Sequence, residues 1–178
     1  MSVTNSRVLL ATPRLILREM TLEDAPGLHA VLGDEQTMRF YPQPFSPAEV
    51  EDWIARQIAR YPTGAGLLGI TLKENGQLIG DCGLVWQDVE GLRQLEIGYH
   101  VHRHHQRQGY ATEAARAVRD YAFNTFPCDH EVSHVISMIR PENLPSRRVA
   151  EKNGLTLSHT IFWRGYDHCI YRIDRPAR

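Results

Sequence analysis

The sequence predicts an α+β fold, an α/β sandwich in which four helices flank a mixed, largely antiparallel sheet of seven strands. Stretches with apolar residues at every second position alternate with stretches at helical spacing, in the order βααβββαβαββ. Turn signals such as Asn75-Gly76 join neighbouring strands as hairpins, which pair antiparallel. A chain of 178 residues can bury one core, so we expect a single domain over residues 1–178.

The first half of the chain has clear helix starts. Thr21 with an acid three residues later is a capping box, and Ser46 followed by Pro and then Glu is a second N-terminal signature. Apolar spacing gives the second helix an inner face, whose members are Val50, Trp53, Ile54, Gln57 and Ile58. The expected elements are strand 14–19, helix 21–32, a helix from 46, and strands 66–73 and 77–86.

The second half begins with a strand at 95–102. Its apolar residues alternate with polar ones, which places them on one face of the sheet and Glu96 on the other. Gly154 stands where a short helix would need a left-handed cap. The further expected elements are helix 109–126, strand 132–139, helix 143–152, and strands 155–162 and 166–173.

Charge and composition exclude several classes of protein. Lys+Arg 20 against Asp+Glu 21 leaves a formal net charge of -1, so no global field favours nucleic acid or an anionic membrane. No apolar run approaches the ~18 residues that span a bilayer, and Arg7 interrupts the short apolar part of the N-terminus, which does not resemble a signal peptide. Three cysteines without metal spacing indicate reduced thiols. We therefore expect a cytoplasmic protein without a membrane or nucleic-acid partner.

The stretch 94–113 predicts an anion site. A strand ends, a donor-rich loop follows at 103–109, and a helix begins at Gly109. The first turn of a helix offers unpaired N–H groups and the positive end of the helix dipole, and phosphate is the usual occupant. Gly109 and Ala111 would let a ligand approach the backbone closely. The same pattern also occurs in ordinary strand–helix connections.

Two motifs carry a family resemblance. Gln106-Arg107-Gln108-Gly109-Tyr110-Ala111 resembles the Q/R-x-x-G-x-G/A signature of the GNAT N-acetyltransferases, whose loop binds the pyrophosphate of acetyl-coenzyme A. About thirty residues later, the segment 141–155 (PENLPSRRVAEKNGL) resembles the second hallmark of that family, in the form of its ribosomal-protein N-terminal (alanine/serine) acetyltransferase branch. The resemblance extends from Thr12 onward. It implies a sheet splayed between strands 95–102 and 132–139, with pantetheine in the gap.

The resemblance also implies which residues bind the cofactor. These are Tyr99, His100, Val101, Gln106, Arg107, Gln108, Gly109, Tyr110, Ala111, Thr112, Asn143, Ser146 and Arg148. Among them, Tyr99 and Val101 would use backbone N–H groups that polarise the thioester carbonyl. Many relatives have Gly at the place of Arg107 and an aromatic residue at that of His105, so Arg107 is either strained or the loop is reshaped.

Several of these positions have an ordinary alternative. Arg107, and likewise Arg103 and Arg148, could supply positive charge near the phosphates or be solvated surface arginines. Asn143 would contact the cofactor arm or simply cap a helix.

Glu96 and Ser146 are the candidate catalytic residues. Glu96 aligns with the glutamate that many GNAT enzymes carry on this strand, and it would act as the base or bind the substrate ammonium. Its ordinary pKa of about 4.3 is low for that role, so we expect a raised pKa or a relay through water. The alternative is a cross-strand ion pair. Many branches place a tyrosine acid seven residues after Asn143, where this chain has Ala150. The role of thiol acid then passes to Ser146, to water, or to no side chain.

Histidines and aromatic residues leave further alternatives open. His100, His102, His104 and His105 could chelate a metal, but no carboxylate or Cys completes a known spacing, so we expect no metal and place them along the phosphate channel. Five aromatic residues would wall the acceptor pocket or pack in the core. They are Phe40, Tyr41, Phe45, Trp86 and Trp163.

The sequence therefore predicts an acetyl-coenzyme A-dependent N-acetyltransferase in which a primary amine attacks the thioester directly. The favoured acceptor is a protein N-terminus, whose pKa of about 7.8 makes it less dependent on a base than a lysine at about 10.4. A small amine such as an antibiotic or polyamine is the close alternative, and a non-catalytic acyl-CoA-binding module is the second. The expected state is a monomer or a homodimer.

Overall fold

One mixed sheet of eight strands runs through the protein, in the order β1-β2-β3-β4-β5-β6-β8-β7. The computed structural model describes residues 6–129 and 131–177. All neighbouring strands are antiparallel except β5 and β6. The strands are β1 Val8–Ala11, β2 Leu15–Arg18, β3 Gly66–Leu72, β4 Leu78–Val89, β5 Leu92–Val101, β6 His134–Ile139, β7 Thr156–Trp163 and β8 Tyr166–Asp174.

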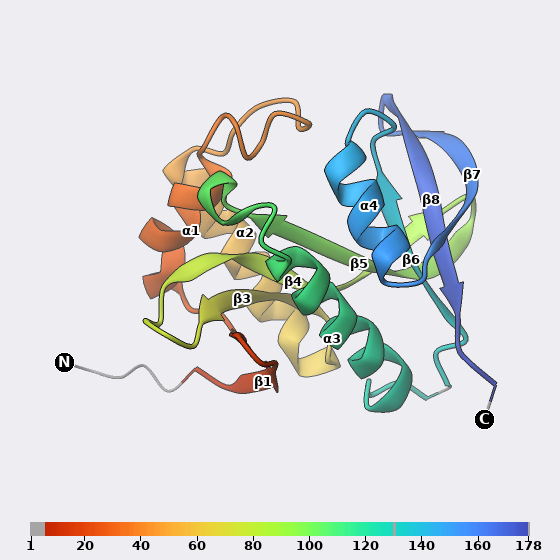
Figure 1. The fold of residues 1–178 in the computed structure, drawn as a ribbon, viewed down its shortest axis with the longest axis horizontal. Coiled ribbons are helices and arrows are strands. Elements are labelled where there is room, and N and C mark those ends of the chain that lie inside the picture. Colours follow the sequence, from red (N-terminus) through yellow and green to blue (C-terminus); the bar gives the residue numbers. More distant parts are fainter. Residues whose placement is uncertain (1–5, 130, 178) are drawn as a thin grey trace.

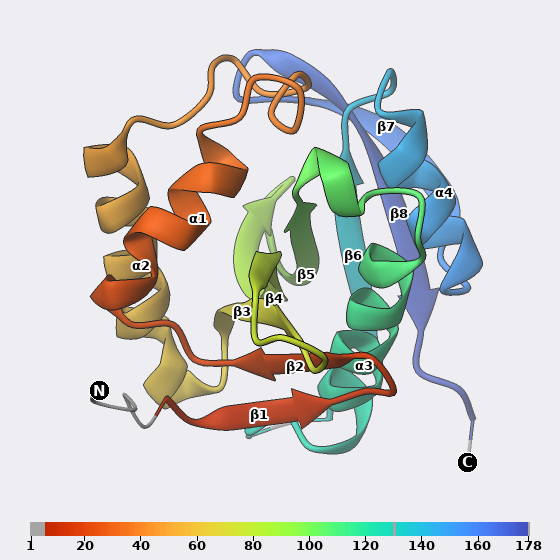
Figure 2. The same ribbon diagram turned by 60° about the vertical axis from the view of Figure 1, so that its left-hand side comes forward.

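Helices cover both faces of this sheet (Figures 1 and 2). On one face α1 and α2 pack together over Met20 and Leu78. On the other face α3 covers the middle strands, and α4 lies beside it, where Asn153 Nδ2 donates to Thr112 O at 3.2 Å. The helices are α1 Ala25–Leu32, α2 Pro47–Arg60, α3 Tyr110–Asn124 and α4 Leu144–Lys152, with short 3-10 turns at Leu22–Asp24, Tyr61–Thr63 and Arg103–His105.

The expected fold class is confirmed, with eight strands instead of seven. The additional strand is β1, a four-residue edge strand with only its two leucines partly buried, which is too short to show a period. The β4–β5 hairpin is also longer than expected. Its strands continue to a two-residue turn, where Glu90 has φ 51 and Gly91 has φ 76. Both angles are positive, as a type I′ turn requires.

The capping signals act as the sequence predicts. Thr21 N donates to Asp24 Oδ2 at 2.8 Å, and Ser46 Oγ accepts from Glu49 N at 3.2 Å. Gly154 has the expected left-handed φ of 85 after α4. The inner face of α2 is narrower than expected, because Ile58 is 39% exposed while Val50, Ile54 and Gln57 are buried.

The sheet opens between β5 and β6, as expected. The two strands are paired only at Glu96 opposite Ile136. From there to Val101, β5 continues against β4 alone. On the β6 side, Ser137 Oγ donates to Ile97 O at 2.9 Å, at the point where the strands begin to diverge. The main-chain edge of β5 beyond Ile97 therefore faces a gap in the ladder.

Candidate active site

The register of β4 and β5 determines which backbone groups face the gap. His102 N donates to Ile79 O at 2.9 Å, just beyond the pair of Gly80 and Val101. Antiparallel strands alternate hydrogen-bonded and non-hydrogen-bonded pairs. Residues of β5 that lie an odd number of positions from His102 therefore turn their N–H and C=O groups away from β4. Tyr99 and Val101 are two such residues. Their amides point toward β6, where the strands have separated.

The same alternation separates His100 from the other expected cofactor residues of β5. His100 belongs to the pairs whose backbone groups point toward β4, opposite Asp81. Its side chain lies on the other face of the sheet from Tyr99 and Val101 and bonds Asp81. The His100 side chain therefore lies on the face of the sheet opposite α3. His102, His104 and His105 lie together in the loop. The centre of the His102 ring is 5.0 Å from that of His104 and 6.1 Å from that of His105.

The loop after β5 leads directly into α3. Gln106 Nε2 donates to Val101 O at 2.8 Å and holds the loop against the strand end. Arg107 has φ 61 and Gly109 has φ 83, so both are left-handed. Arg107 therefore takes the strained one of its two expected conformations. Residues 107–109 are exposed, and the first residues of α3, Tyr110, Ala111 and Thr112, are half-buried.

Arg14 braces this helix start, a contact that sequence reasoning did not identify. Its Nη1 donates to Gln108 O at 2.9 Å, and its Nε lies 2.7 Å from Glu113 Oε2. Its guanidinium also lies 4.3 Å from the centre of the Tyr110 ring. Desolvation opposes ionisation of Glu113, but hydrogen bonds from Thr12 and Arg14 outweigh it and lower the pKa of that carboxyl.

The start of α4 lies against β5. Asn143 Oδ1 accepts from Ser146 N at 3.2 Å, so Asn143 is the helix cap. Tyr99 Oη donates to Ser146 O at 2.8 Å and ties the first turn of α4 to β5. Ser146 is half-buried there, whereas Arg148 is exposed. Ala150 is only 3% exposed and packs in the hydrophobic cluster between α4, β6 and β8.

Glu96 lies on the opposite face of β5, in a desolvated position. Gln87 Nε2 donates to its Oε2 at 2.8 Å, and Met138 N approaches its Oε1 at 3.4 Å. Desolvation raises the pKa of Glu96 above its ordinary value. The two hydrogen bonds, together with nearby His100 and Arg164, oppose this shift without cancelling it. A base with a raised pKa is better matched to an amine acceptor.

A second carboxylate on this face was not singled out from the sequence. Asp81 is fully buried and accepts from Trp53 Nε1 at 2.9 Å. Its other oxygen lies 2.7 Å from His100 Nδ1. The alternation of side chains along the strand at 95–102 places His100 on the face of Glu96. Asp81 and Trp53, however, come from β4 and α2, and only the tertiary structure brings them together with His100.

Three of the five expected aromatic residues belong to this face. Tyr41 lies 5.1 Å from the His100 ring, and Phe45 lies 5.7 Å from Trp53. Trp163 packs with the cluster that contains Ile136, the partner of Glu96.

The other two aromatic residues, Phe40 and Trp86, make their contacts elsewhere. Phe40 stacks on Arg39, with 4.6 Å between guanidinium and ring. Trp86 takes the core alternative, because it pairs with Leu95 and packs in the α3 core against Phe126.

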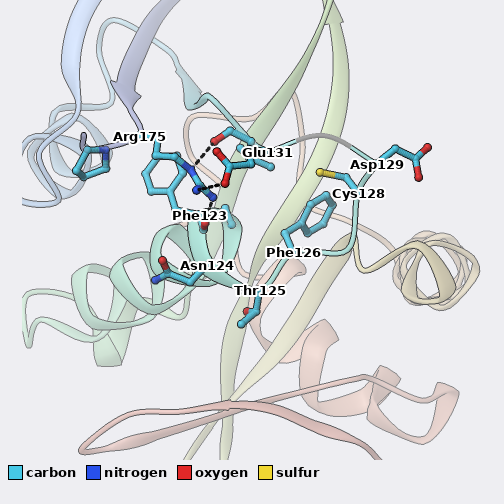
Figure 3. Close-up of a pocket in the computed structure, with 11 residues that line it drawn as sticks. Phe123, Asn124, Thr125, Phe126, Cys128, Asp129, Glu131 and Arg175 are labelled. Atoms are coloured by element: carbon cyan, nitrogen blue, oxygen red, sulfur yellow. Dashed lines mark hydrogen bonds and ion pairs between the residues drawn. The ribbon is translucent and has the colours of Figure 1, made fainter. Parts of the chain in front are cut away.

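A separate hollow of about 450 Å³ lies at the C-terminal end of α3 (Figure 3). Arg175 crosses it, forms an ion pair with Glu131 at 3.2 Å, and donates to Phe123 O. The carboxyl end of a helix carries partial negative charge. This hollow therefore does not suit a diphosphate, and it contains none of the expected site residues.

Within residues 6–129 and 131–177, no group of three or more His, Cys, Asp or Glu side chains is arranged to hold a metal ion. Among the helices of that same part of the chain, none is long and apolar enough to cross a membrane. Cys82, Cys128 and Cys169 form no disulfide within the described part of the chain.

A parted sheet, a left-handed glycine loop at a helix start and a desolvated glutamate together define the class of the protein as an acyltransferase of the GNAT type. The comparison with protein families agrees. The model of the acetyltransferase (GNAT) domain matches residues 14–156. The chain belongs to this family, as its two motifs predict, and it is an N-acetyltransferase.

Individual relatives extend this result. The uncharacterized protein YkkB of Bacillus subtilis is 35% identical over 88% of this chain and 90% of its own length. Two solved structures share the fold at 19% identity. RimL, a ribosomal L7/L12 α-N-protein acetyltransferase in complex with coenzyme A, has a TM-score of 0.74 over 94% of this chain and 98% of its own. The aminoglycoside acetyltransferase AAC(6')-Ib, also in complex with coenzyme A, has a TM-score of 0.72 over 90% of this chain and 95% of its own.

Proposed function

We propose that the protein transfers the acetyl group of acetyl-coenzyme A to a primary amine, and that its acceptor is a protein N-terminus. The observation that carries this proposal is the position of Glu96 beside the parted edge of β5. Three residues along the same strand, the Tyr99 amide points into the gap. A thioester in the gap and an amine on the Glu96 face would therefore meet at one strand.

The cofactor side supports the proposal through its backbone. Gly109 begins α3 with φ 83, and a Cβ at this position would meet Arg14 Nη2 at 3.2 Å. Because Gly109 has no Cβ, a ligand can approach the N–H groups of the first turn, which suit a diphosphate. The pantetheine would follow the open edge of β5. There the amides of Tyr99 and Val101 would donate to the thioester oxygen as it becomes an oxyanion.

The transfer then needs three proton movements. An ammonium acceptor loses a proton, and its nitrogen lone pair attacks the carbonyl carbon. The attacking nitrogen loses a second proton as the carbon–sulfur bond breaks, and the departing thiolate gains one. We assign Glu96, directly or through water, as a base on the amine side. We assign Ser146, half-buried at the start of α4, as the acid on the thiol side.

The acceptor is the finer part of the proposal. RimL is named as an α-N-protein acetyltransferase of a ribosomal protein, and the second motif of this chain resembles that branch, which supports a peptide acceptor. The aminoglycoside acetyltransferase supports a small amine as the alternative. Two separate segments approach the Glu96 face, because Tyr41 from the loop after α1 and Arg164 from the β7–β8 turn both interact with Glu96. A chain terminus could enter between them.

A thiol-release assay tests both levels of the proposal. Four acceptor sets would be compared: peptides with a free α-amino group and no lysine, matched N-acetylated peptides with one lysine, polyamines, and aminoglycosides. We expect release of coenzyme A with the first set. Release with polyamines or aminoglycosides alone would select the small-amine alternative. Binding of acetyl-coenzyme A without turnover on any set would contradict an enzymatic function.

A further inference from the structure

The face of β5 that carries Glu96 also carries a second proton-accepting side chain. His100 lies on the same face, four residues further along the strand, and its side chain is only 10% exposed. Between the two residues stands Gly98. A Cβ at this position would be 3.5 Å from Leu67 Cδ2, and apart from its chain neighbours it would meet no other heavy atom within 4 Å. The backbone at Gly98 is thus flanked by one carboxylate and one imidazole, with no side chain of its own.

Asp81 determines which nitrogen of His100 carries the proton. The Asp81 side chain is 0% exposed and lies 2.7 Å from His100 Nδ1. A carboxylate can only accept hydrogen bonds, so the nitrogen that faces it must be the donor. The neutral ring then has its lone pair on Nε2, the nitrogen turned away from Asp81. Such an imidazole can receive a proton at Nε2.

The surroundings hold the ring in place. Trp53 Nε1 donates to the second oxygen of Asp81 at 2.9 Å, so each oxygen of this buried carboxylate has a donor. The Trp53 ring lies edge-on to His100 with 6.0 Å between centroids, and the Tyr41 ring lies at 5.1 Å. Helix α2, strand β4 and the loop after α1 therefore fix the imidazole from three sides.

The stoichiometry of the reaction provides a role for two acceptors. An ammonium loses two protons on its way to an amide, and the thiolate takes up one. We propose that His100, positioned by Asp81, accepts one of these two protons at Nε2, directly or through water, while Glu96 accepts the other. Both protons then pass to solvent, while the thiolate gains its proton from Ser146, which solvent reprotonates, so that one proton is released in total. This inference rests on the proposed amine acetylation.

Other groups around His100 do not replace it in this role. Desolvation, followed by the charges of Asp81 and Glu96, raises the pKa of Tyr41, so its hydroxyl stays neutral at physiological pH. Arg164 carries a fixed positive charge from the β7–β8 turn, and Trp53 only donates. Glu96 and His100 Nε2 are thus the proton acceptors that this face offers, because both oxygens of Asp81 already face a donor.

The pH dependence of kcat/KM for the amine provides the first test. His100→Gln should lower kcat/KM by about 100-fold at pH 7, the usual contribution of a general base, and by less at pH 9.5, where more of the amine is already neutral. The Kd for acetyl-coenzyme A should not change. His159→Gln is the matched control, because His159 forms a similar pair with Glu90 at 2.8 Å on an exposed edge strand. An effect of His100→Gln below twofold at every pH would overturn the proposal.

The tautomer of His100 provides a test that needs no turnover and no variant. Long-range ¹H–¹⁵N correlation on the resting protein should show His100 protonated at Nδ1 and free at Nε2. Asp81→Asn should remove this preference, whereas Trp53→Phe should retain it. An Nε2-protonated ring in the unmodified protein would overturn the proposal even if the enzyme is active. Absence of thiol release with every acceptor, by contrast, would refute the proposed function itself.

Discussion

The two faces of β5 are built from different chemical groups. On the α3 face, the site consists of main-chain amides and left-handed residues of one continuous segment, Tyr99 to Thr112. On the α1–α2 face, it consists of buried or half-buried titratable side chains from separate elements, with Asp81 and His100 bonded to each other. The first face should therefore respond to changes in backbone geometry, and the second to pH.

The largest effect should come from the backbone of the cofactor loop. Gly109→Val should weaken acetyl-coenzyme A binding by about 100-fold, about 3 kcal/mol, because a branched residue is strained at φ 83 and its Cβ would meet Arg14. Isothermal titration calorimetry would measure this. Gly91→Val is the control, since Gly91 has φ 76 in the β4–β5 turn with nothing within 4 Å of its Cβ. Equal losses of affinity in both variants would show that strain acts globally and not at the site.

On the other face, the effect of Glu96→Gln should depend on pH. The pKa of Glu96 is raised by desolvation, and its basic form is present above that pKa. We expect kcat to fall by about 100-fold at pH 6.5 and by clearly less at pH 9, where the amine deprotonates without help. Initial-rate measurements across this range provide the test. A uniform loss at all pH values would instead indicate a structural role for Glu96.

A smaller effect is expected at the brace of the cofactor loop. Arg14→Ala removes the bond to Gln108 O, the ion pair with Glu113 and the contact with the Tyr110 ring. The KM for acetyl-coenzyme A should rise by about tenfold, roughly the loss of one charged hydrogen bond, while kcat stays within about twofold. Arg7→Ala is the control, because Arg7 is 69% exposed at 3.8 Å from Glu19. A fall in kcat without a change in KM would contradict a positioning role.

The smallest expected effect is on stability. A carboxyl with a raised folded-state pKa stabilises the fold while protonated, and this contribution is lost as pH rises through the folded pKa. Glu96→Gln should therefore increase the free energy of unfolding at pH 8 by about 1 kcal/mol, which raises Tm by about 2–4 °C, and it should leave Tm unchanged at pH 4. Differential scanning calorimetry would measure both. A lower Tm at pH 8 would mean that the Gln87 and Met138 contacts outweigh desolvation.

The contrast between the faces also explains what the sequence could predict. The loop at 106–111 is local, and its glycine and helix start are visible in one segment. Most strands and hairpins were predictable for the same reason. The short edge strand β1 was not, since only pairing with β2 defines it.

The Glu96 face depends on strand register, which joins residues distant in sequence. Trp86 stands two residues after Leu84, so both side chains lie on the same face of the strand. This shared face favours the core alternative for Trp86. Asp81 and Trp53 give no such signal, because their roles arise only when α2 packs over β4 and places the indole beside the carboxylate.

Backbone hydrogen exchange with and without acetyl-coenzyme A tests the central claim most directly. If the cofactor binds along the open edge of β5 and at the start of α3, then the amides of Tyr99, Val101 and residues 109–112 should become protected. The amides around Arg175, at the other end of α3, should not change. Protection around Arg175 without any at Tyr99 and Val101 would contradict this account of the site.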